Sequence, residues 1–147
     1  MLFRSGVSNF DRREIQEAVT LPHGDAIVTN QVLYNLEERG IEWDLLPWCR
    51  ARTMPLMAYS PLGSQSQSLR EHPALRDVAQ RLGASPARAA LAWLLRQPGV
   101  ITIPKAAEEA HVRDNHAALA LHLSAEDVAL LDAAFPPPRS ATPLAII

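Results

Sequence analysis

Polar side chains that can form hydrogen bonds follow each of four apolar segments that the sequence predicts to be strands. In chain order they are Ser8 and Asn9, Asn30 and Gln31, Tyr59 and Ser60, and Lys105. The carboxyl ends of parallel strands are where α/β proteins usually bind ligands. The alternative for any single one of these residues is a turn or a helix cap, because Ser and Asn are common in both. Their recurrence at four successive strand ends favours a binding site.

The types of these side chains indicate a planar ligand that carries an amide and a phosphate. Asn9 and Gln31 each offer a donor and an acceptor, which suits a flat amide such as a nicotinamide. Tyr59 could stack its ring on a planar heterocycle, or it could pack in the core with its hydroxyl at the rim. Lys105 precedes a predicted helix and suits a phosphate, or it is a solvated surface lysine. His111 and Asn115 share one helix face, where they either reach the same anion or lie in water.

Composition limits the other classes of function. The chain has 147 residues, of which 48% are hydrophobic and 20% charged, and this is typical of one globular domain. Its formal net charge of −2 gives no electrostatic case for nucleic acid. One cysteine, Cys49, excludes an internal disulfide and a cysteine-based zinc site, and we expect no metal. No apolar run approaches ~20 residues, so a cytoplasmic protein without a membrane partner is expected.

Helical and strand patterns alternate along the chain. A strand ends within "GVSNF" (6–10), and further strands are expected at 26–32, 54–63 and 100–104. Helices are expected at 11–19, 43–49, 73–83, 85–99, 108–119 and 125–135. Asp11 with Glu14, and Ser124 with Asp127, have the spacing of capping boxes. The tail at 136–147 is too rich in proline to be regular.

The remaining distinctive residues favour structural roles. Trp43, Trp48 and Trp93 lie at helical positions and are expected to pack against the sheet. Cys49 has no pattern of basic neighbours, so we expect an inert thiol. The segment 70–72 is expected to be a solvated loop.

The order of the predicted elements indicates an α/β fold with a parallel sheet and right-handed crossovers. Four strand–helix units fit an open α/β sheet. They also fit half of an eight-stranded barrel, because a whole (β/α)8 barrel takes about 250 residues. The pattern alone does not choose between these two architectures.

Six short motifs carry a resemblance to a known family. They are "GVSNF", "NQVLYN", "AYSPLG", "LAWLL", "IPKA" and "HVRDN", in this order. Together they resemble the aldo-keto reductases, most closely the bacterial members, from about Ser5 to the tail. That family forms a (β/α)8 barrel and reduces aldehydes and ketones with NADPH, without metal or flavin. The resemblance implies that residues 1–147 form a single C-terminal half-barrel segment, strands five to eight, with an irregular tail at 136–147.

The resemblance implies roles for the residues at the nicotinamide end of the cofactor. Ser8, Asn9 and Gln31 match the residues that hydrogen-bond the nicotinamide carboxamide. Tyr59 matches the aromatic residue that stacks on the nicotinamide ring and leaves one hydride face open.

Further matches concern the phosphates and the adenosine. The stretch that runs along the pyrophosphate is represented by Ser60, Leu62 and Ser64. Lys105 matches the lysine that meets the 2′-phosphate, and Asn115 matches the asparagine that contacts adenine.

Two departures from the family pattern concern cofactor preference. Ala106 stands where many members have a serine on the 2′-phosphate, and His111 stands where many have an arginine. A histidine is mostly neutral at pH 7 and lacks the bidentate fork of arginine. The expected cofactor is NADP(H), with NAD(H) as the alternative.

The family's catalytic Asp, Tyr, Lys and His belong to strands that precede the matched ones, so no catalytic residue is assigned here. The chain is expected to be the cofactor-binding half of a reductase for small carbonyl substrates, inactive alone, with an N-terminal half or a second copy as its partner. The alternatives are a non-catalytic NADP-binding half-barrel that pairs with itself or with another half, and a degenerate remnant.

Overall fold

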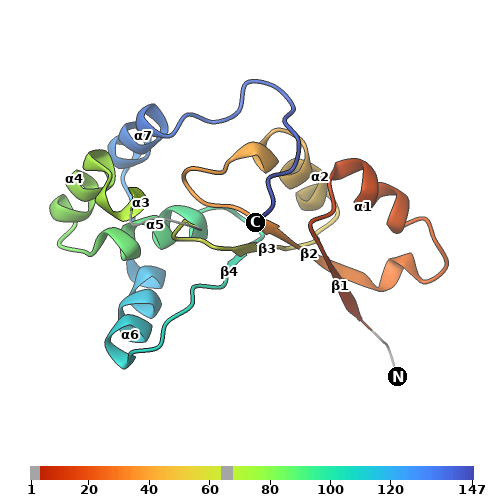
Figure 1. Cartoon of the computed structure of the whole chain (residues 1–147), viewed down its shortest axis with the longest axis horizontal. Helices are drawn as coiled ribbons and strands as arrows, with labels where there is room; N and C mark the ends of the chain where they lie inside the picture. Colours follow the sequence, from red (N-terminus) through yellow and green to blue (C-terminus); the bar gives the residue numbers. More distant parts are fainter. Residues whose placement is uncertain (1–3, 64–67) are drawn as a thin grey trace.

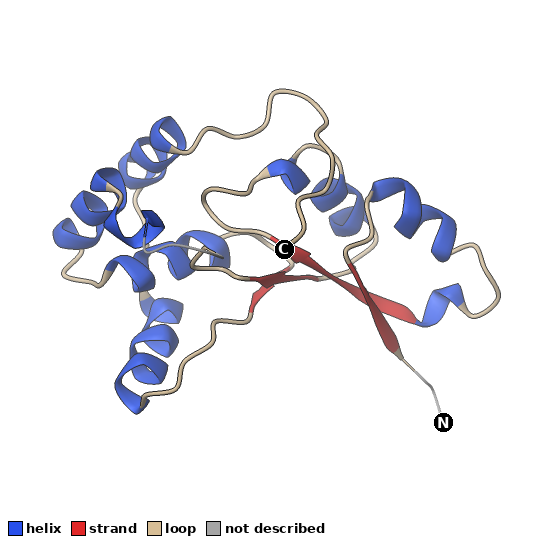
Figure 2. Ribbon diagram, in the orientation of Figure 1, coloured by secondary structure: helices blue, strands red, loops and turns tan. Residues whose placement is uncertain are grey.

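The computed structural model describes residues 4–63 and 68–147. Two strand–helix steps and a third strand open the fold: β1 (Ser5–Ser8), α1 (Arg12–Ala18), β2 (Ile27–Leu33), α2 (Leu45–Ala51) and β3 (Leu56–Tyr59). Three helices then lead to the last strand: α3 (Ser68–Glu71), α4 (Pro73–Arg81), α5 (Pro86–Leu95) and β4 (Val100–Thr102). The chain continues through α6 (Glu109–Ala117) and α7 (Ala125–Ala134) into an irregular tail (Figure 2). Short 3-10 turns occupy Gly24–Ala26, Gly40–Glu42 and Ala118–Ala120.

The strands form one parallel sheet in the order β1-β2-β3-β4, so neighbours in sequence are neighbours in space. Ser8 lies opposite Gln31, and Leu33 lies opposite Tyr59, which brings the ends of the first three strands close together. The expectation of four parallel strands alternating with helices is confirmed. Within the described residues β1 and β4 are the edges of this sheet.

Helices cover one face of the sheet, and the other face is left to the C-terminal tail, which lies over Leu33, and to solvent. Side chains alternate between the faces of a strand, and Val32, Leu56 and Ala58 are fully buried on the face that α1 and α2 cover (Figure 1). The opposite face carries Tyr59, which is half-buried, and Ile101, which is 44% exposed. The site residues on the strands therefore lie beside a sheet face that the helices do not cover.

Local sequence signals set several of the helix ends. Asp11 and Glu14 form the expected capping box at the start of α1, and Ser124 and Asp127 form another at the start of α7. Such reciprocal bonds satisfy backbone N–H groups that have no partner inside the helix. Gly83 follows α4 with φ +59°, a left-handed conformation that favours glycine and stops the helix.

Three expectations from the sequence are wrong. The apolar run at 54–63 forms a strand only over Leu56–Tyr59, because Ser60 turns to a left-handed φ of 47°. Arg70 and Glu71 belong to the short helix α3 and not to a loop. Trp43 is 49% exposed beside a 3-10 turn, whereas Trp48 and Trp93 are buried as expected.

A buried arginine ties the C-terminal helix to the rest of the fold. The Arg39 guanidinium donates two hydrogen bonds to the Glu42 carboxylate, at 2.8 and 2.9 Å, and another to Asp132 at 2.7 Å. It also donates to the Phe135 carbonyl oxygen at 2.6 Å and lies 4.8 Å from the centre of the Trp93 ring. Since a buried charge is tolerated only when it is paired, these contacts fix where α7 ends.

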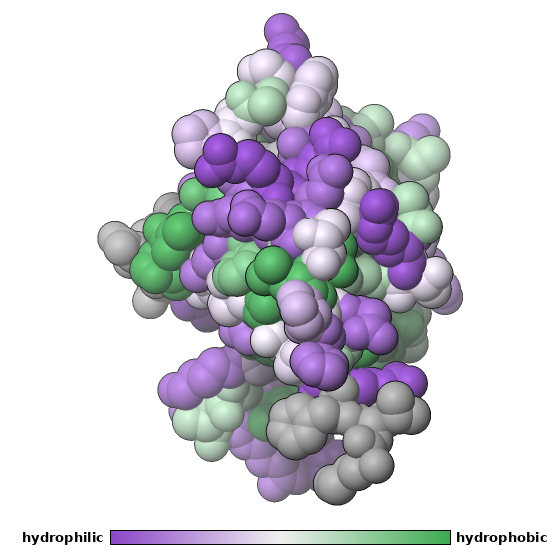
Figure 3. Space-filling model, turned by 90° about the vertical axis from the view of Figure 1, so that its right-hand side faces the viewer, coloured by the Kyte–Doolittle hydropathy of each residue, from purple (hydrophilic) through white to green (hydrophobic). Residues whose placement is uncertain are grey.

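The surface on the side that carries α1 and β1 is mostly hydrophilic, with smaller hydrophobic patches between the polar residues (Figure 3). Within the described part of the chain, no helix combines the length and the apolar character that a membrane span needs.

Candidate functional site

The structure brings four of the sequence-predicted residues together at the ends of β1, β2 and β3. The Tyr59 hydroxyl donates a hydrogen bond to Asn9 Oδ1 over 3.0 Å, although fifty positions separate the two residues. The Asn9 backbone N–H donates to the Gln31 carbonyl oxygen at 2.8 Å, and the Ser8 hydroxyl donates to the same oxygen at 3.1 Å. These four residues, Ser8, Asn9, Gln31 and Tyr59, are called the strand-end cluster below.

The strand-end cluster combines an aromatic ring with amide groups, which is the chemistry that a nicotinamide needs. Ser8 is exposed, and Asn9, Gln31 and Tyr59 are half-buried, so all four remain open to a ligand. Among the hydrogen bonds of the described residues, none engages the side-chain amide of Gln31. Gln31 can therefore offer both a donor and an acceptor to a flat amide.

A buried asparagine next to the cluster fixes the end of β1. Asn30 is 0% exposed, and its Nδ2 donates to the Phe10 carbonyl oxygen at 2.7 Å. The Phe10 N–H in turn approaches Asn30 Oδ1 at 3.4 Å. The side chain of Asn30 thus continues the pairing between β1 and β2 past Ser8, through the turn that presents Asn9.

A second buried asparagine holds the end of β3. Asn35 is 1% exposed, and its Nδ2 donates to the Ser60 carbonyl oxygen at 3.0 Å. Its Oδ1 accepts from the Glu37 and Glu38 N–H groups at 2.9 and 3.0 Å. The role of Asn35 was missed by sequence reasoning, although an isolated amide beside an apolar strand is a signal for a buried hydrogen-bonding residue.

Two residues directly after strands adopt left-handed backbone conformations. Asn9 has φ 57° and Ser60 has φ 47°, a region that costs energy for residues other than glycine and is tolerated best by Asn and Asp. The turn at Asn9 directs its side chain to Tyr59, and the turn at Ser60 ends the strand immediately after Tyr59.

The predicted residues beyond β4 form a separate group. Lys105 is exposed in the loop between β4 and α6, His111 is exposed on α6, and Asn115 is half-buried on α6. In the part of the chain that the structure describes, no hydrogen bond or ion pair joins these three residues to the strand-end cluster. An elongated ligand would be needed to contact both groups.

The predicted pyrophosphate residues are only partly described. Leu62 is half-buried and packs against the hydrophobic core, and Ser60 is held by Asn35. Ser64 lies outside the described residues.

The environments of Cys49 and Asp114 shift the pKa values of these two groups in opposite directions. Burial raises the pKa of the Cys49 thiol to about 11, and the free, buried Cys49 is a poor nucleophile, as expected. Asp114 on α6 has a lowered pKa: partial burial opposes ionisation, but hydrogen bonds from Ser85 and Arg88 outweigh it. Among the described residues, no group of three or more His, Cys, Asp or Glu side chains is placed to hold a metal ion.

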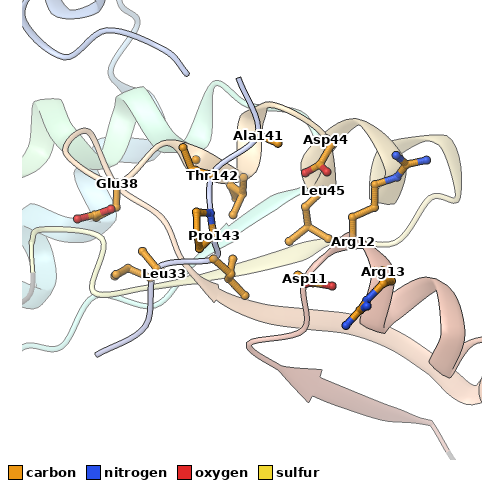
Figure 4. A pocket seen from close by; sticks show the side chains of 14 residues that line it. Asp11, Arg12, Arg13, Leu33, Glu38, Asp44, Leu45, Ala141, Thr142 and Pro143 are labelled. Carbon is orange, nitrogen blue, oxygen red and sulfur yellow. The ribbon is translucent and has the colours of Figure 1, made fainter. Parts of the chain in front are cut away.

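A cavity of about 280 Å³ lies elsewhere, between the start of α1, the end of β2 and the tail (Figure 4). Thr142 and Pro143 of the tail lie over Leu33, and charged groups of both signs border the space. None of the nine predicted cofactor residues that the structure describes lines this cavity. The strand-end cluster is thus distinct from this cavity.

Comparison with known proteins gives a family and a set of close structures. Residues 4–135 match the model of the Aldo/keto reductase family. The methylglyoxal reductase YeaE of Escherichia coli is 46% identical over 147 residues, covering 98% of this chain and 52% of the relative. An uncharacterised oxidoreductase of Bacillus subtilis, YtbE, is 34% identical over 87% of this chain and 44% of its own length.

Solved structures of aldo-keto reductases likewise match most of this chain over about half of their own length. An aldo-keto reductase from Klebsiella pneumoniae, crystallised with NADPH, matches with a TM-score of 0.94 and 45% identity. The match covers 98% of this chain and 52% of that protein. The thermostable aldo-keto reductase Tm1743, in complex with the inhibitor epalrestat, matches with a TM-score of 0.76 and 41% identity over 88% of this chain. The chain thus spans about half the length of the relatives that it matches.

Proposed function

Because the chain belongs to the Aldo/keto reductase family, we propose that it is the NADP(H)-binding, C-terminal half of a reductase barrel, strands five to eight of eight. Residues 1–147 make up this half-barrel as one unit, with 136–147 as its irregular tail. The observation that carries the proposal is the contact between Asn9 and Tyr59, which joins the ends of β1 and β3 at a cluster of amide groups. The NADPH complex of the Klebsiella pneumoniae relative, with a TM-score of 0.94, supports it.

Each residue of the strand-end cluster has a role toward the nicotinamide. Tyr59 would stack on one face of the nicotinamide ring, and the hydrogen bond from its hydroxyl to Asn9 fixes the orientation of the aromatic ring. Gln31, Asn9 and Ser8 hydrogen-bond the carboxamide and so fix the rotation of the nicotinamide ring. The bound NADPH supplies the hydride that reduces a carbonyl carbon. These residues select which face of the ring stays open to that carbonyl.

The other half of the cofactor follows the strand ends toward α6. Ser60 and Leu62 would flank the pyrophosphate, together with Ser64, which lies outside the described residues. Lys105 would meet the 2′-phosphate and Asn115 the adenine, and His111 stands where many family members have an arginine. Lys105 precedes α6 by a few residues and carries a charge in solvent, which suits a phosphate. NADP(H) is the preferred cofactor on this account, and NAD(H) binds more weakly.

The substrate of the complete reductase is a small aldehyde or ketone, and the proton donor comes from the other half of the barrel. No residue of this chain is assigned to proton transfer. Loss of general acid catalysis alone lowers a rate by about 10²–10⁴-fold. The chain by itself therefore binds cofactor without turning over an aldehyde.

Calorimetric titration of the chain with NADPH tests this function. Wild type should bind, and Tyr59→Ala should bind about tenfold more weakly, because an aromatic stacking contact is worth ~1–1.5 kcal/mol. Trp43→Ala is the matched control, since it removes an exposed aromatic residue on another part of the surface. Absence of binding by wild type, or equal weakening in both variants, would refute the cofactor assignment.

Activity, binding and assembly measurements on the same purified chain distinguish the inactive reductase half from a self-pairing binding module and from a degenerate remnant. Steady NADPH oxidation with an aldehyde, above a heat-treated control, would contradict the absence of a catalytic acid. Tight NADPH binding without turnover, in a stable assembly of two copies, would favour a binding module that pairs with itself. Absence of both binding and cooperative unfolding would favour a degenerate remnant.

A further inference from the structure

Helix α6 is held in place by polar contacts. It runs from Glu109 to Ala117, and none of its residues is buried. Its main contacts are with α5 and with the 3-10 turn that follows it. A helix that buries no apolar side chain gains little orientation from hydrophobic packing. Polar contacts must therefore fix which face of α6 points toward a ligand.

A cluster of three side chains from α5 and α6 supplies this constraint. Arg88 on α5 donates from Nε to Asp114 Oδ1 at 2.9 Å, and its Nη2 donates to the same oxygen. The Ser85 hydroxyl donates to the other carboxylate oxygen, Oδ2. Ser85 Oγ also accepts from the Arg88 N–H at 3.0 Å and caps α5.

The geometry leaves Asp114 fully engaged. Both of its carboxylate oxygens have partners, and the Arg88 and Asp114 side chains are only 29% and 24% exposed. A forked arginine contact of this kind fixes orientation as well as distance. Arg113 on the same helix pairs with Glu109 within α6, with both side chains 77% exposed, so that pair does not connect α6 to α5.

We propose that Arg88 is a positioning residue for the adenosine end of the cofactor. Through Asp114 it sets the rotation of α6, and thereby the direction in which the neighbouring Asn115 and His111 face. With both Asp114 oxygens taken by Arg88 and Ser85, Asn115 is the side chain of this pair that stays available to a base. The inference rests on the proposed function, because it assumes that α6 binds the adenosine half of NADP(H).

Separate titrations with the two halves of the cofactor test this role. The probes are adenosine 2′,5′-bisphosphate, followed by calorimetry, and reduced nicotinamide mononucleotide, followed by saturation-transfer NMR. The proteins are the 147-residue chain, in the assembly that it forms in solution, and the variants Arg88→Ala, Arg88→Lys, Asp114→Ala and Arg88→Ala/Asp114→Ala. Arg113→Ala, which breaks the exposed pair within α6, is the matched control.

Each single alanine variant should weaken the bisphosphate about 5–20-fold and leave the mononucleotide within twofold of wild type. The double variant should be no weaker than either single one, because both act through one contact. Arg88→Lys should recover part of the affinity, since it keeps the charge but not the fork. If Arg88→Ala does not fold by circular dichroism, Arg88→Lys with its intermediate loss decides the question.

The outcomes distinguish this inference from the function on which it rests. Binding of both probes by wild type, with unchanged affinities in the Arg88 variants, overturns the positioning role alone. Equal loss for both probes indicates general destabilisation and also overturns it. Wild type that binds neither probe overturns the proposed cofactor function, and the role of Arg88 with it.

Discussion

Replacing Asn35 with leucine is expected to lower the free energy of unfolding by about 1.5–4.5 kcal/mol. Leucine has a similar volume but removes one hydrogen-bond partner from each of three backbone groups in a site that is 1% exposed. These are the Ser60 carbonyl oxygen and the Glu37 and Glu38 N–H groups, now bonded at 2.9–3.0 Å. A net loss of ~0.5–1.5 kcal/mol for each bond gives the stated range. That range is a large part of the 5–15 kcal/mol that stabilises a typical domain.

Urea unfolding followed by tryptophan fluorescence measures the change, and hydrogen exchange locates it. The Glu37 and Glu38 amide protons should lose their protection, because they donate to the side chain that is removed. Ser8→Ala is the control: it removes a single exposed hydrogen bond to the Gln31 carbonyl oxygen and should cost less than ~0.5 kcal/mol. A loss for Asn35→Leu as small as that of the control would refute the claim that Asn35 holds the end of β3.

Three further predictions concern cofactor preference, assembly and acid stability. Lys105→Ala should weaken NADPH roughly tenfold and NADH less than twofold in calorimetric titrations; equal losses would exclude the 2′-phosphate contact. Light scattering coupled to size exclusion should give a mass above the 16.2 kDa of one chain. Ile101 on β4 and Ile103 just beyond it are 44% and 39% exposed, and β1 and β4 are the edges of the sheet within the described residues. A sharp 16.2 kDa peak with cooperative unfolding would contradict this prediction. Burial opposes ionisation of Asp127, but the Ser124 hydrogen bonds and Arg81 hold its pKa below the ordinary value. Its contribution to the free energy of unfolding is therefore complete above about pH 4 and lost as the pH falls through the lowered pKa. In urea unfolding, Asp127→Asn should reduce the decrease of the unfolding free energy with falling pH in this acid range. An unchanged pH dependence would count against this role of Asp127.

The elements that the sequence predicted well are those that local chemistry determines. Asp11 and Ser124 cap helices through side chains three residues away, so a short window of sequence contains the whole interaction. The parallel order of the strands also followed from the alternation of apolar strands with helices. Strand length was less predictable: the run at 54–63 stops at Tyr59, because Ser60 takes a conformation that its own side chain does not favour.

Positions set by distant partners could not be predicted from local patterns. Ser60 keeps its backbone conformation beside the amide of Asn35, twenty-five residues earlier in the chain. Trp43 has the pattern of a buried helical residue, yet it is 49% exposed because α2 begins only at Leu45. The residue types at the strand ends indicated which side chains carry hydrogen-bonding chemistry. The contact between Asn9 and Tyr59 needed the register of three strands.

The polar residues at the strand ends are of two kinds: those in left-handed turns and buried asparagines that hydrogen-bond the backbone of those turns. Asn9 and Ser60 occupy left-handed conformations, which cost of order 1–3 kcal/mol when the residue is not glycine, and less for asparagine. Directly beside them Asn30 and Asn35, both almost fully buried, hydrogen-bond the backbone of the same two turns. The buried amides stabilise turns that isolated loops would not keep. Half-buried Asn9 and Tyr59 are thereby held in contact, while the Gln31 side-chain amide makes no hydrogen bond within the described residues. The proposed binding of a flat amide would therefore need no prior rearrangement of these turns.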